Sequence, residues 1–313
     1  MLVGIIAACV LATPWSFGRV EAGVASPRRY EAGNLELNLL PPPWVGSAVE
    51  QQEARARIES VQAEGGFVPG RALGTDRLGR DVAARVLSGG VVSLSVGLSA
   101  ALVAVVLGTA VGAVSGFAGG RVDSVLMRGV DVLYGLPSIL LVVLLAIAVD
   151  GVVERLGFEP RPVIRQWLGL ATLFISIGGI GWLNLARIVR GQVLSLREQP
   201  FMEACEAIAV PWRRRLARHV LPNLAGPVLV YATLAVPAAM LAESFLSFLG
   251  IGVREPLPSW GNLAADALQE LNPFRSRWWL LAAPCVALSA TLVGLNLVGD
   301  RLRRRIDPTT RTS

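Results

Sequence analysis

The charged side chains best able to do chemistry in this sequence lie together in residues 203–223, which read EACEAIAVPWRRRLARHVLPN. Two glutamates, four arginines and the only histidine of the chain, His219, fall within this segment. A polar segment of this kind between two long apolar runs suits contact with something at a membrane surface. A single imidazole cannot form an HExxH zinc site.

Lysine is missing from the whole sequence, so all 29 basic residues are arginine. A Walker A phosphate loop needs a lysine, which excludes ATP hydrolysis by that motif. The three cysteines, Cys9, Cys205 and Cys285, are far apart and form neither a CxxC site nor a disulfide framework. We therefore expect no catalytic residue, no cofactor and no metal in this chain.

Helical spacing organises the apolar residues of the same segment. They recur at i, i+3, i+4, i+7 and i+8 through Phe201, Ala204, Cys205, Ile208 and Ala209. Pro211 is predicted to end this helix and to begin a second one, which runs to Pro222. Such a pair of short helices suits a groove on a soluble partner, or a flat position on lipid, and the residues alone leave both open.

The rest of the chain predicts an all-α membrane protein with about six transmembrane helices. It is 53% hydrophobic with a mean hydropathy of +0.56. Roughly 20 apolar residues span the ~30 Å hydrocarbon layer as a helix. Suitable runs occur at about 1–18, 91–118, 132–149, 166–186, 224–242 and 278–299. The run at 1–18 is the least certain transmembrane prediction. No basic residue precedes it, which also argues against a signal peptide, and a translation start assigned too late would account for the missing residues.

Arginine placement predicts the orientation of these helices. With both termini in the cytoplasm, the inner segments hold 14 Arg against 6 acidic residues, whereas the outer segments hold 15 of each. Short cytoplasmic loops carry such a positive excess. The basic pI of about 10.2 is also compatible with nucleic-acid binding, but arginines at the inner ends of spans favour anionic lipid, so we expect no nucleic acid.

Small residues predict close helix packing within the membrane. Gly108, Gly112 and Gly116 recur every four residues, a pattern that lets two helix backbones approach. Two acids also fall within the apolar runs, Asp131 and Glu243. Such residues line a pathway, form a structural hydrogen bond or pair with a neighbouring chain. An ion-coupled carrier that uses them, or a membrane anchor without transport, are the alternative functions.

The segment at 203–223 resembles the EAA loop of ABC importer permeases. Glu203, Ala204 and Cys205 occupy the Glu-Ala-Ala positions, Ala209 the glycine position, and 220–223 the closing apolar-Leu-Pro-Asn. Two departures are Cys205 for the second alanine and Ala209 for the glycine. A left-handed turn would be strained at an alanine, so either the helix runs on to Pro211 or the coupling is altered.

Further stretches resemble the second permease subunit of dipeptide, oligopeptide and nickel importers. They are LGTDRLGRDV (73–82), FAGGRVD (117–123), VDVLYGLPSILL (130–141), RIVRGQVLSLREQPFMEA (187–204), AESFLSFLGIGVREPLPSWGNL (242–263) and NLVGDRLRRRIDP (296–308). Most of residues 70–310 is covered, and the stretches taken together are specific.

The resemblance implies an ABC type I importer permease in the inner membrane that imports peptides or a related small solute. The implied partners are a homologous permease, two cytoplasmic ATPases and an external substrate-binding protein. The residues implied to couple to the ATPases are Glu203, Ala204, Cys205, Ala207, Ala209, Pro222 and Asn223.

The expected organisation has four parts. Residues 1–18 form the first transmembrane helix, and residues 19–90 an external loop with an amphipathic segment at 44–70. Residues 91–300 form the five-helix permease domain, with its EAA loop at about 199–223, and residues 301–313 a basic cytoplasmic tail.

Overall fold

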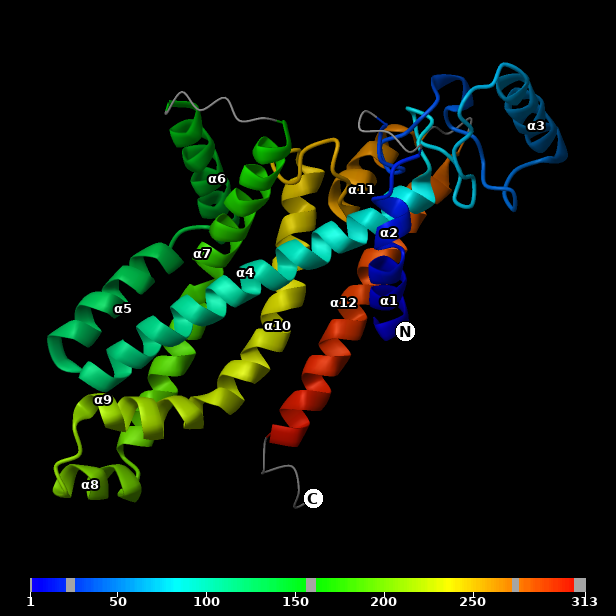
Figure 1. Cartoon of the computed structure of the whole chain (residues 1–313). Coiled ribbons are helices and arrows are strands. Elements are labelled where there is room, and N and C mark those ends of the chain that lie inside the picture. Colours follow the sequence, from blue (N-terminus) through cyan, green and yellow to red (C-terminus); the bar gives the residue numbers. More distant parts are fainter. Residues whose placement is uncertain (1, 21–25, 156–161, 272–275, 307–313) are drawn as a thin grey trace. The chain divides into compact units, whose positions relative to one another are not determined.

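The computed structural model describes residues 2–20, 26–155, 162–271 and 276–306 (Figure 1). These residues form helices joined by turns and loops, and no strand occurs among them beyond isolated bridges. The helices are α1 (Leu2–Leu11), α2 (Thr13–Ser16), η1 (Leu35–Leu37), α3 (Ala48–Ala63), α4 (Val82–Ala118), α5 (Gly120–Tyr134), α6 (Ser138–Arg155), α7 (Pro162–Arg197), α8 (Pro200–Ala207), α9 (Trp212–Arg215), the π-helical turn η2 (Leu216–Val220), α10 (Leu221–Phe248), α11 (Trp260–Gln269) and α12 (Trp278–Ile306). Of the predicted tail, residues 307–313 lie outside the described residues.

Four helices in the described part of the chain are long and apolar enough to cross a membrane. They cover Val82–Ala118, Gln166–Arg197, Trp212–Phe248 and Trp278–Arg305. The helices α5 and α6 are apolar and long enough only when taken together, and they are bent by 95° at residues 135–137, so the pair is either one broken span or a re-entrant loop. The apolar helix Leu2–Ser16 is shorter. The all-α membrane fold is thus confirmed, and the predicted third span differs, because Gly135 and Pro137 interrupt its helix near Asp131.

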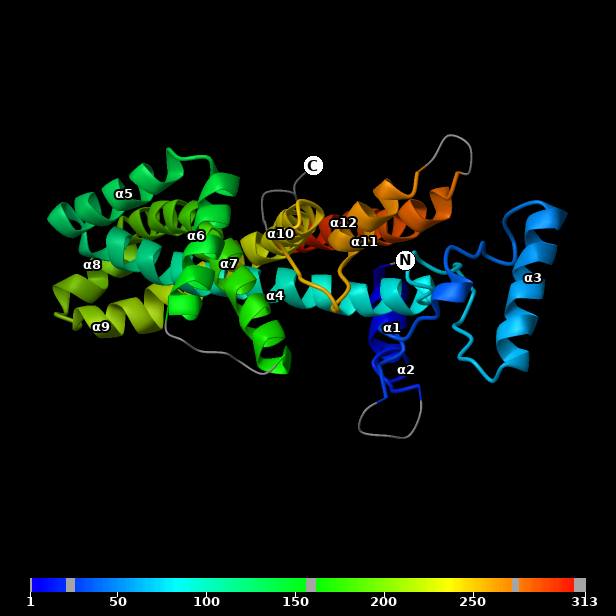
Figure 2. The same ribbon diagram turned by 90° about the horizontal axis from the view of Figure 1, so that it is seen from above.

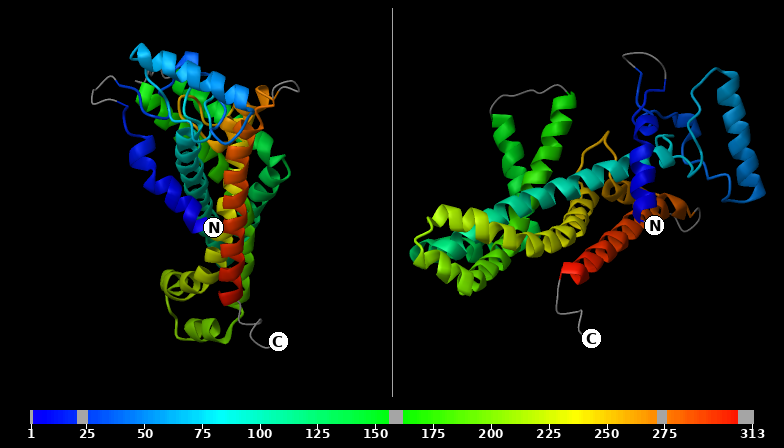
Figure 3. Two further views of the ribbon diagram at one scale, coloured as in Figure 1. Left: turned by 90° about the vertical axis from the view of Figure 1, so that its right-hand side faces the viewer. Right: turned by 60° about the horizontal axis from the view of Figure 1, so that its bottom comes forward.

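The chain divides into two compact units, which are described separately. Unit 1 comprises residues 1–95 and 243–294, and unit 2 comprises residues 96–242 and 295–313. Within unit 1, α3 buries Ala54 and Val61 against Leu37 and Leu40 (Figure 3, left, where α3 is light blue). The helix starts at a capping box in which Ser47 and Glu50 bond to each other's backbone. The amphipathic segment predicted near 44–70 therefore belongs to a small apolar core.

Within unit 2, α4 and α7 lie side by side along a row of glycines (Figure 2). A Cβ atom on Gly108 would lie 2.7 Å from Leu185 Cβ, and one on Gly112 would lie 2.4 Å from the carbonyl oxygen of Ala186. A Cβ on Gly116 would lie 2.9 Å from the Arg190 carbonyl oxygen. Only hydrogen fits in these gaps, which confirms the packing role predicted from the four-residue spacing.

Candidate functional site

The segment from residue 198 to residue 211 of unit 2 forms a short helix followed by a tight turn (Figure 1). Pro200 is the first residue of α8, where a missing N–H has no helical partner to lose. Gln199 precedes it in an extended conformation with φ −80° and ψ 144°. The proline therefore fixes the point at which the chain, after leaving α7, turns into α8.

A Schellman motif closes α8 at its other end. The N–H of Ala209 donates to the Glu206 carbonyl oxygen, and the N–H of Val210 donates to that of Cys205, both at 2.9 Å. This motif needs a left-handed residue, usually glycine, and Ala209 takes that position with φ 53°. The predicted helix through Ile208 and Ala209 is corrected: α8 ends at Ala207, and the chain turns before Pro211.

One buried side chain attaches α8 to the helices around it. Met202 is 3% exposed and belongs to a core cluster contributed by α4, α7, η2 and α10. The other buried members are Ala113, Leu185, Val189, Val193, Val220 and Leu224. Sequence reasoning missed Met202 because it lies outside the stripe that begins at Phe201. The signal was present, since methionine is the one large aliphatic residue in the first turn of α8.

The opposite side of α8 is open to solvent. Glu203, Ala204 and Ala207, which belong to the predicted coupling set, are exposed. Ile208 is 75% exposed and Phe201 is 40% exposed, although both are large and apolar. Cys205 is a free cysteine of intermediate exposure. The predicted apolar stripe thus faces outward, which is the arrangement that a docking helix requires.

An ion pair connects α9 to α8, and aromatic contacts connect α9 to α4. Arg215 Nη1 lies 3.3 Å from Glu206 Oε2, and the Arg215 guanidinium carbon is 5.8 Å from the centroid of the Phe117 ring. The rings of Phe117 and Trp212 are 6.4 Å apart. Phe117 is in the last turn of α4. The membrane-spanning helix α4 therefore contacts α9 through Phe117, and it contacts α8 through the core cluster that contains Met202.

The second short helix predicted from Pro211 to Pro222 is corrected by the structure. The helical backbone runs from Trp212 to Phe248 through the π-helical turn η2. Pro222 is the second residue of α10, and Asn223 Nδ2 donates to the His219 carbonyl oxygen at 2.7 Å. A π turn is wider than an α turn, so it accommodates a residue without an N–H and the helix continues past the proline.

Two ion pairs connect α5 to α7 in unit 2. Arg190 donates through Nε and Nη2 to both carboxylate oxygens of Asp123, at 2.5 and 2.6 Å. Arg187 Nη2 donates to Asp131 Oδ1 at 2.7 Å, and its guanidinium carbon is 4.1 Å from the centre of the Tyr134 ring. Sequence reasoning named Asp131 but missed both arginines. The signal was two arginines three residues apart, on one face of α7.

Glu243 lies in a cluster of hydroxyl groups in unit 1. Its side chain is fully buried, and its carboxylate accepts hydrogen bonds from Ser247 Oγ at 2.7 Å and from Ser244 Oγ at 3.3 Å. The hydroxyls of Ser93 and Ser259 also hydrogen-bond to it. A buried carboxyl group needs such partners, and four serines from three parts of the chain provide them.

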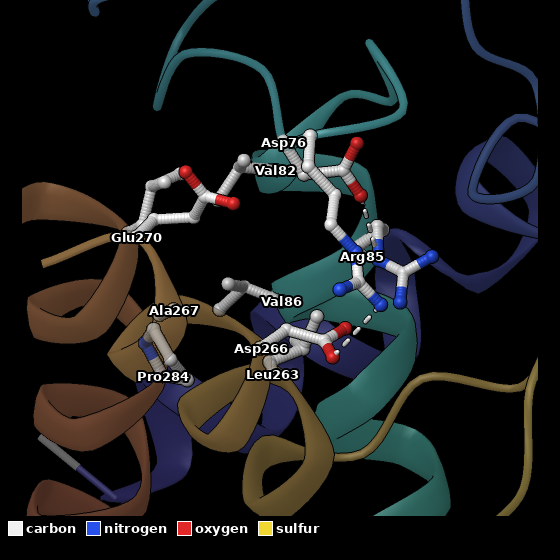
Figure 4. Close-up of a pocket in the computed structure, with 11 residues that line it drawn as sticks. Asp76, Val82, Arg85, Val86, Leu263, Asp266, Ala267, Glu270 and Pro284 are labelled. Carbon is white, nitrogen blue, oxygen red and sulfur yellow. Dashed lines mark ion pairs between the residues drawn. The ribbon is translucent and has the colours of Figure 1, made fainter. Parts of the chain in front are cut away.

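The predicted motif at 73–82 forms a charged cluster with α11 (Figure 4), and Glu255, in the segment that follows α10, pairs with Arg80 and Arg85. Asp76 Oδ2 lies 2.6 Å from Arg80 Nε and 3.6 Å from Arg85 Nε. Arg77 pairs with Asp266 at 3.5 Å. Burial raises the pKa of the Asp266 carboxyl, and the positive charge of Arg77 opposes this shift.

A cavity of about 30 Å³ adjoins the charged cluster, between α4, α11 and α12. Val82, Val86, Leu263 and Ala267 wall it, and the fully buried Arg85 borders it (Figure 4). It has room for about one water molecule, not for a peptide.

The family model and the similar proteins both point to one family of membrane transport components. The family described as binding-protein-dependent transport system inner membrane component matches residues 104–312. An oligopeptide transport system permease protein of Haemophilus influenzae is 42% identical over 238 residues, covering 75% of this chain and 70% of the relative. A dipeptide transport system permease protein of Bacillus subtilis is 40% identical, with 75% and 68% covered. An oligopeptide permease of Escherichia coli is 43% identical, with 76% and 72% covered.

A solved structure has a similar fold. It is an inward-facing conformation of the MetNI methionine ABC transporter, with a TM-score of 0.51 and 15% identity. The match covers 71% of this chain and 96% of that one. At this identity the similarity concerns the fold alone.

Proposed function

The chain belongs to the family of binding-protein-dependent transport system inner membrane components, and we propose that it is the permease subunit of an importer for peptides. Relatives at 40 to 43% identity are named as oligopeptide and dipeptide permeases, which supports peptides over other solutes. Nickel, which the wider resemblance also implies, stays a prediction. The family consists of membrane components of transport systems, so the chain is a permease and not an enzyme.

We infer that the working transporter contains a second, homologous permease, two cytoplasmic ATPases and an external substrate-binding protein. The chain lies in the inner membrane with several crossings, and both termini in the cytoplasm agree with the arginine excess of the inner segments. The proposed organisation keeps residues 1–18 as the first crossing, 19–90 as the external loop and 91–300 as the permease domain. The predicted cytoplasmic tail is 301–313.

The outward-facing side of α8 is the observation that carries the coupling proposal. Glu203, Ala204 and Ala207 lie on that side beside the large exposed side chain of Ile208. Met202, on the opposite side of α8, packs into the core cluster. A helix that presents small and apolar residues in this way suits a groove on another protein. Cys205, Ala209, Pro222 and Asn223 are proposed to shape the same surface and its connection to α10.

Coupling through this surface follows from its rigid attachment. Because α8 shares a core with α4, α7 and α10, a displacement of α8 is transmitted to membrane-spanning helices. ATP binding by the partner subunits favours one of two arrangements of the transporter. The contacts at α8 differ between these arrangements, so ATP binding shifts the membrane-spanning helices toward one of them.

We propose that the two acids in the apolar runs, Asp131 and Glu243, mainly stabilise the fold of this chain. Asp131 is bonded to Arg187 and Glu243 to serine hydroxyls, contacts that stabilise the folded chain. A role for either acid in the substrate pathway or in pairing with the second permease stays a prediction. The alternative function, an ion-coupled carrier, would depend on these acids and would work without an ATPase. The following experiment distinguishes that carrier from the importer.

The experiment compares Glu203→Arg with Glu198→Arg in the transporter reconstituted with its ATPases and binding protein. Both glutamates are exposed and lie five residues apart, so the charge change is matched. We expect Glu203→Arg to abolish substrate-stimulated ATP hydrolysis and peptide uptake while membrane insertion is retained, and Glu198→Arg to keep both activities. Normal uptake by a variant with both Glu203→Arg and Ala209→Arg would refute the coupling role of α8.

A further inference from the structure

Three arginines project from the start of the helix that follows the α8 turn. Arg213, Arg214 and Arg218 are exposed, and none has an ion-pair partner among the residues that the structure describes. Their neighbour Arg215 differs, because it is paired with Glu206 and its side chain is only 19% exposed. The chain therefore satisfies one arginine of this group internally and leaves three facing outward.

Exposed apolar and acidic side chains occur in the same segment as these arginines. Trp212 is 54% exposed, and the Arg213 guanidinium carbon lies 5.4 Å from the centroid of its ring. The outward side of α8, with Ile208 and Glu203, belongs to the same unit and is tied to α9 through the Glu206 pair. We call the exposed residues of α8 together with Arg213, Arg214 and Arg218 the docking surface.

A flat anionic membrane is a poor match for this surface. Lipid phosphates attract arginine but repel the carboxylates of Glu203 and Glu206, which are exposed on α8. A protein surface can oppose each sign with its complement and still receive Ile208 in an apolar groove. The mixture of charges therefore favours a protein as the occupant.

We infer that Arg213, Arg214 and Arg218 contact acidic side chains on the rim of the ATPase groove that receives α8. This inference rests on the proposed function, because it takes the cytoplasmic ATPase to be the protein that α8 enters. The apolar positions of α8 then supply the central contact, and the arginines supply a charged border. Rim charges accelerate association and exclude like-charged partners, so the border selects an ATPase whose rim is acidic.

The test measures binding of the purified ATPase to the full-length permease in neutral detergent across a range of NaCl concentrations. Three exposed ion pairs together contribute a change on the order of tenfold in affinity at low salt, and this contribution shrinks as salt screens it. We expect R213Q/R214Q/R218Q to weaken binding by that factor at low salt and to flatten the salt dependence.

The matched control is R303Q/R304Q/R305Q, which removes the same charge from the exposed last turn of α12. We expect it to change the affinity by less than about twofold, because non-specific attraction falls off within a Debye length. Equal weakening by both triple variants would overturn the inference. The double variant R213Q/R214Q, which leaves η2 unchanged, replaces the first triple variant if that one does not fold.

Two further outcomes separate the possible failures. If Glu203→Arg releases the ATPase but the arginine variants bind normally, this inference is wrong and the proposed coupling function stands. If neither releases it, the proposed function itself fails. An effect of the arginine variants that appears only in nanodiscs with anionic lipid, and not in neutral detergent, would assign the three arginines to lipid and refute the inference.

Discussion

Replacing Ala209 with glycine should make the turn at the end of α8 more stable. Ala209 has φ 53°, where an alanine side chain costs about 1–2 kcal/mol relative to a right-handed conformation. Glycine removes this strain but adds freedom to the unfolded chain, which costs about 0.4–1 kcal/mol. The net gain is about 1 kcal/mol, which is roughly a fivefold shift in a local opening equilibrium.

Hydrogen exchange followed by mass spectrometry on the segment 200–211 measures this change. The N–H groups of residues 209 and 210 close the Schellman motif, so they and the last turn of α8 should exchange about fivefold more slowly in Ala209→Gly. The control is Ala204→Gly, at an exposed position within α8, where glycine costs about 1 kcal/mol and exchange should accelerate. Faster exchange in both variants would show that residue 209 is not held in the left-handed conformation.

Three other predictions test other parts of the fold. Gly112→Ala should lower the yield of folded protein in detergent, because its Cβ would lie 2.4 Å from a carbonyl oxygen of α7, whereas Gly191→Ala, with no atom within 4 Å, should be tolerated; equal yields would contradict the close packing. Glu243→Ala should cost about 1–3 kcal/mol of stability through stranded hydroxyl groups, and Glu243→Gln should cost less, as thermal unfolding in detergent would measure. Burial raises the pKa of Asp81, so the folded state holds this proton more tightly than the unfolded chain does, and stability falls as pH rises from the ordinary carboxyl pKa through the raised value. Asp81→Asn, which still caps α4, should make the dependence of stability on pH shallower. An unchanged pH dependence would contradict the assignment to Asp81.

The features that repeat along a single helix could be predicted from the sequence. The spacing of Gly108, Gly112 and Gly116 predicted a close helix contact, and the structure has that contact with α7. The apolar runs at 91–118, 166–186, 224–242 and 278–299 each fall within one of the four long apolar helices, although those helices extend up to 12 residues beyond the runs. In both cases the information lies within a few turns, so neighbouring residues determine it.

Features that join distant segments could not be predicted in this way. The pairing of Asp123 with Arg190 depends on how α5 folds back beside α7, which no local pattern specifies. The anchor at Met202 was missed for the same reason, because its partners come from four different helices. The end of α8 was also misjudged, since an alanine in the left-handed conformation runs against residue preference and is held there by two hydrogen bonds.

The glycine row between α4 and α7 restricts which movements are open to unit 2. Where two backbones touch across hydrogen atoms, a slip of one residue would drive a side chain into the opposing main chain. No rotamer change can relieve such a collision, because the backbone fixes the position of a Cβ atom. We therefore expect this stretch of α4 and α7 to move as one rigid body throughout a transport cycle. Any change of shape has to arise at the outer faces of the pair, where flexible side chains can exchange neighbours.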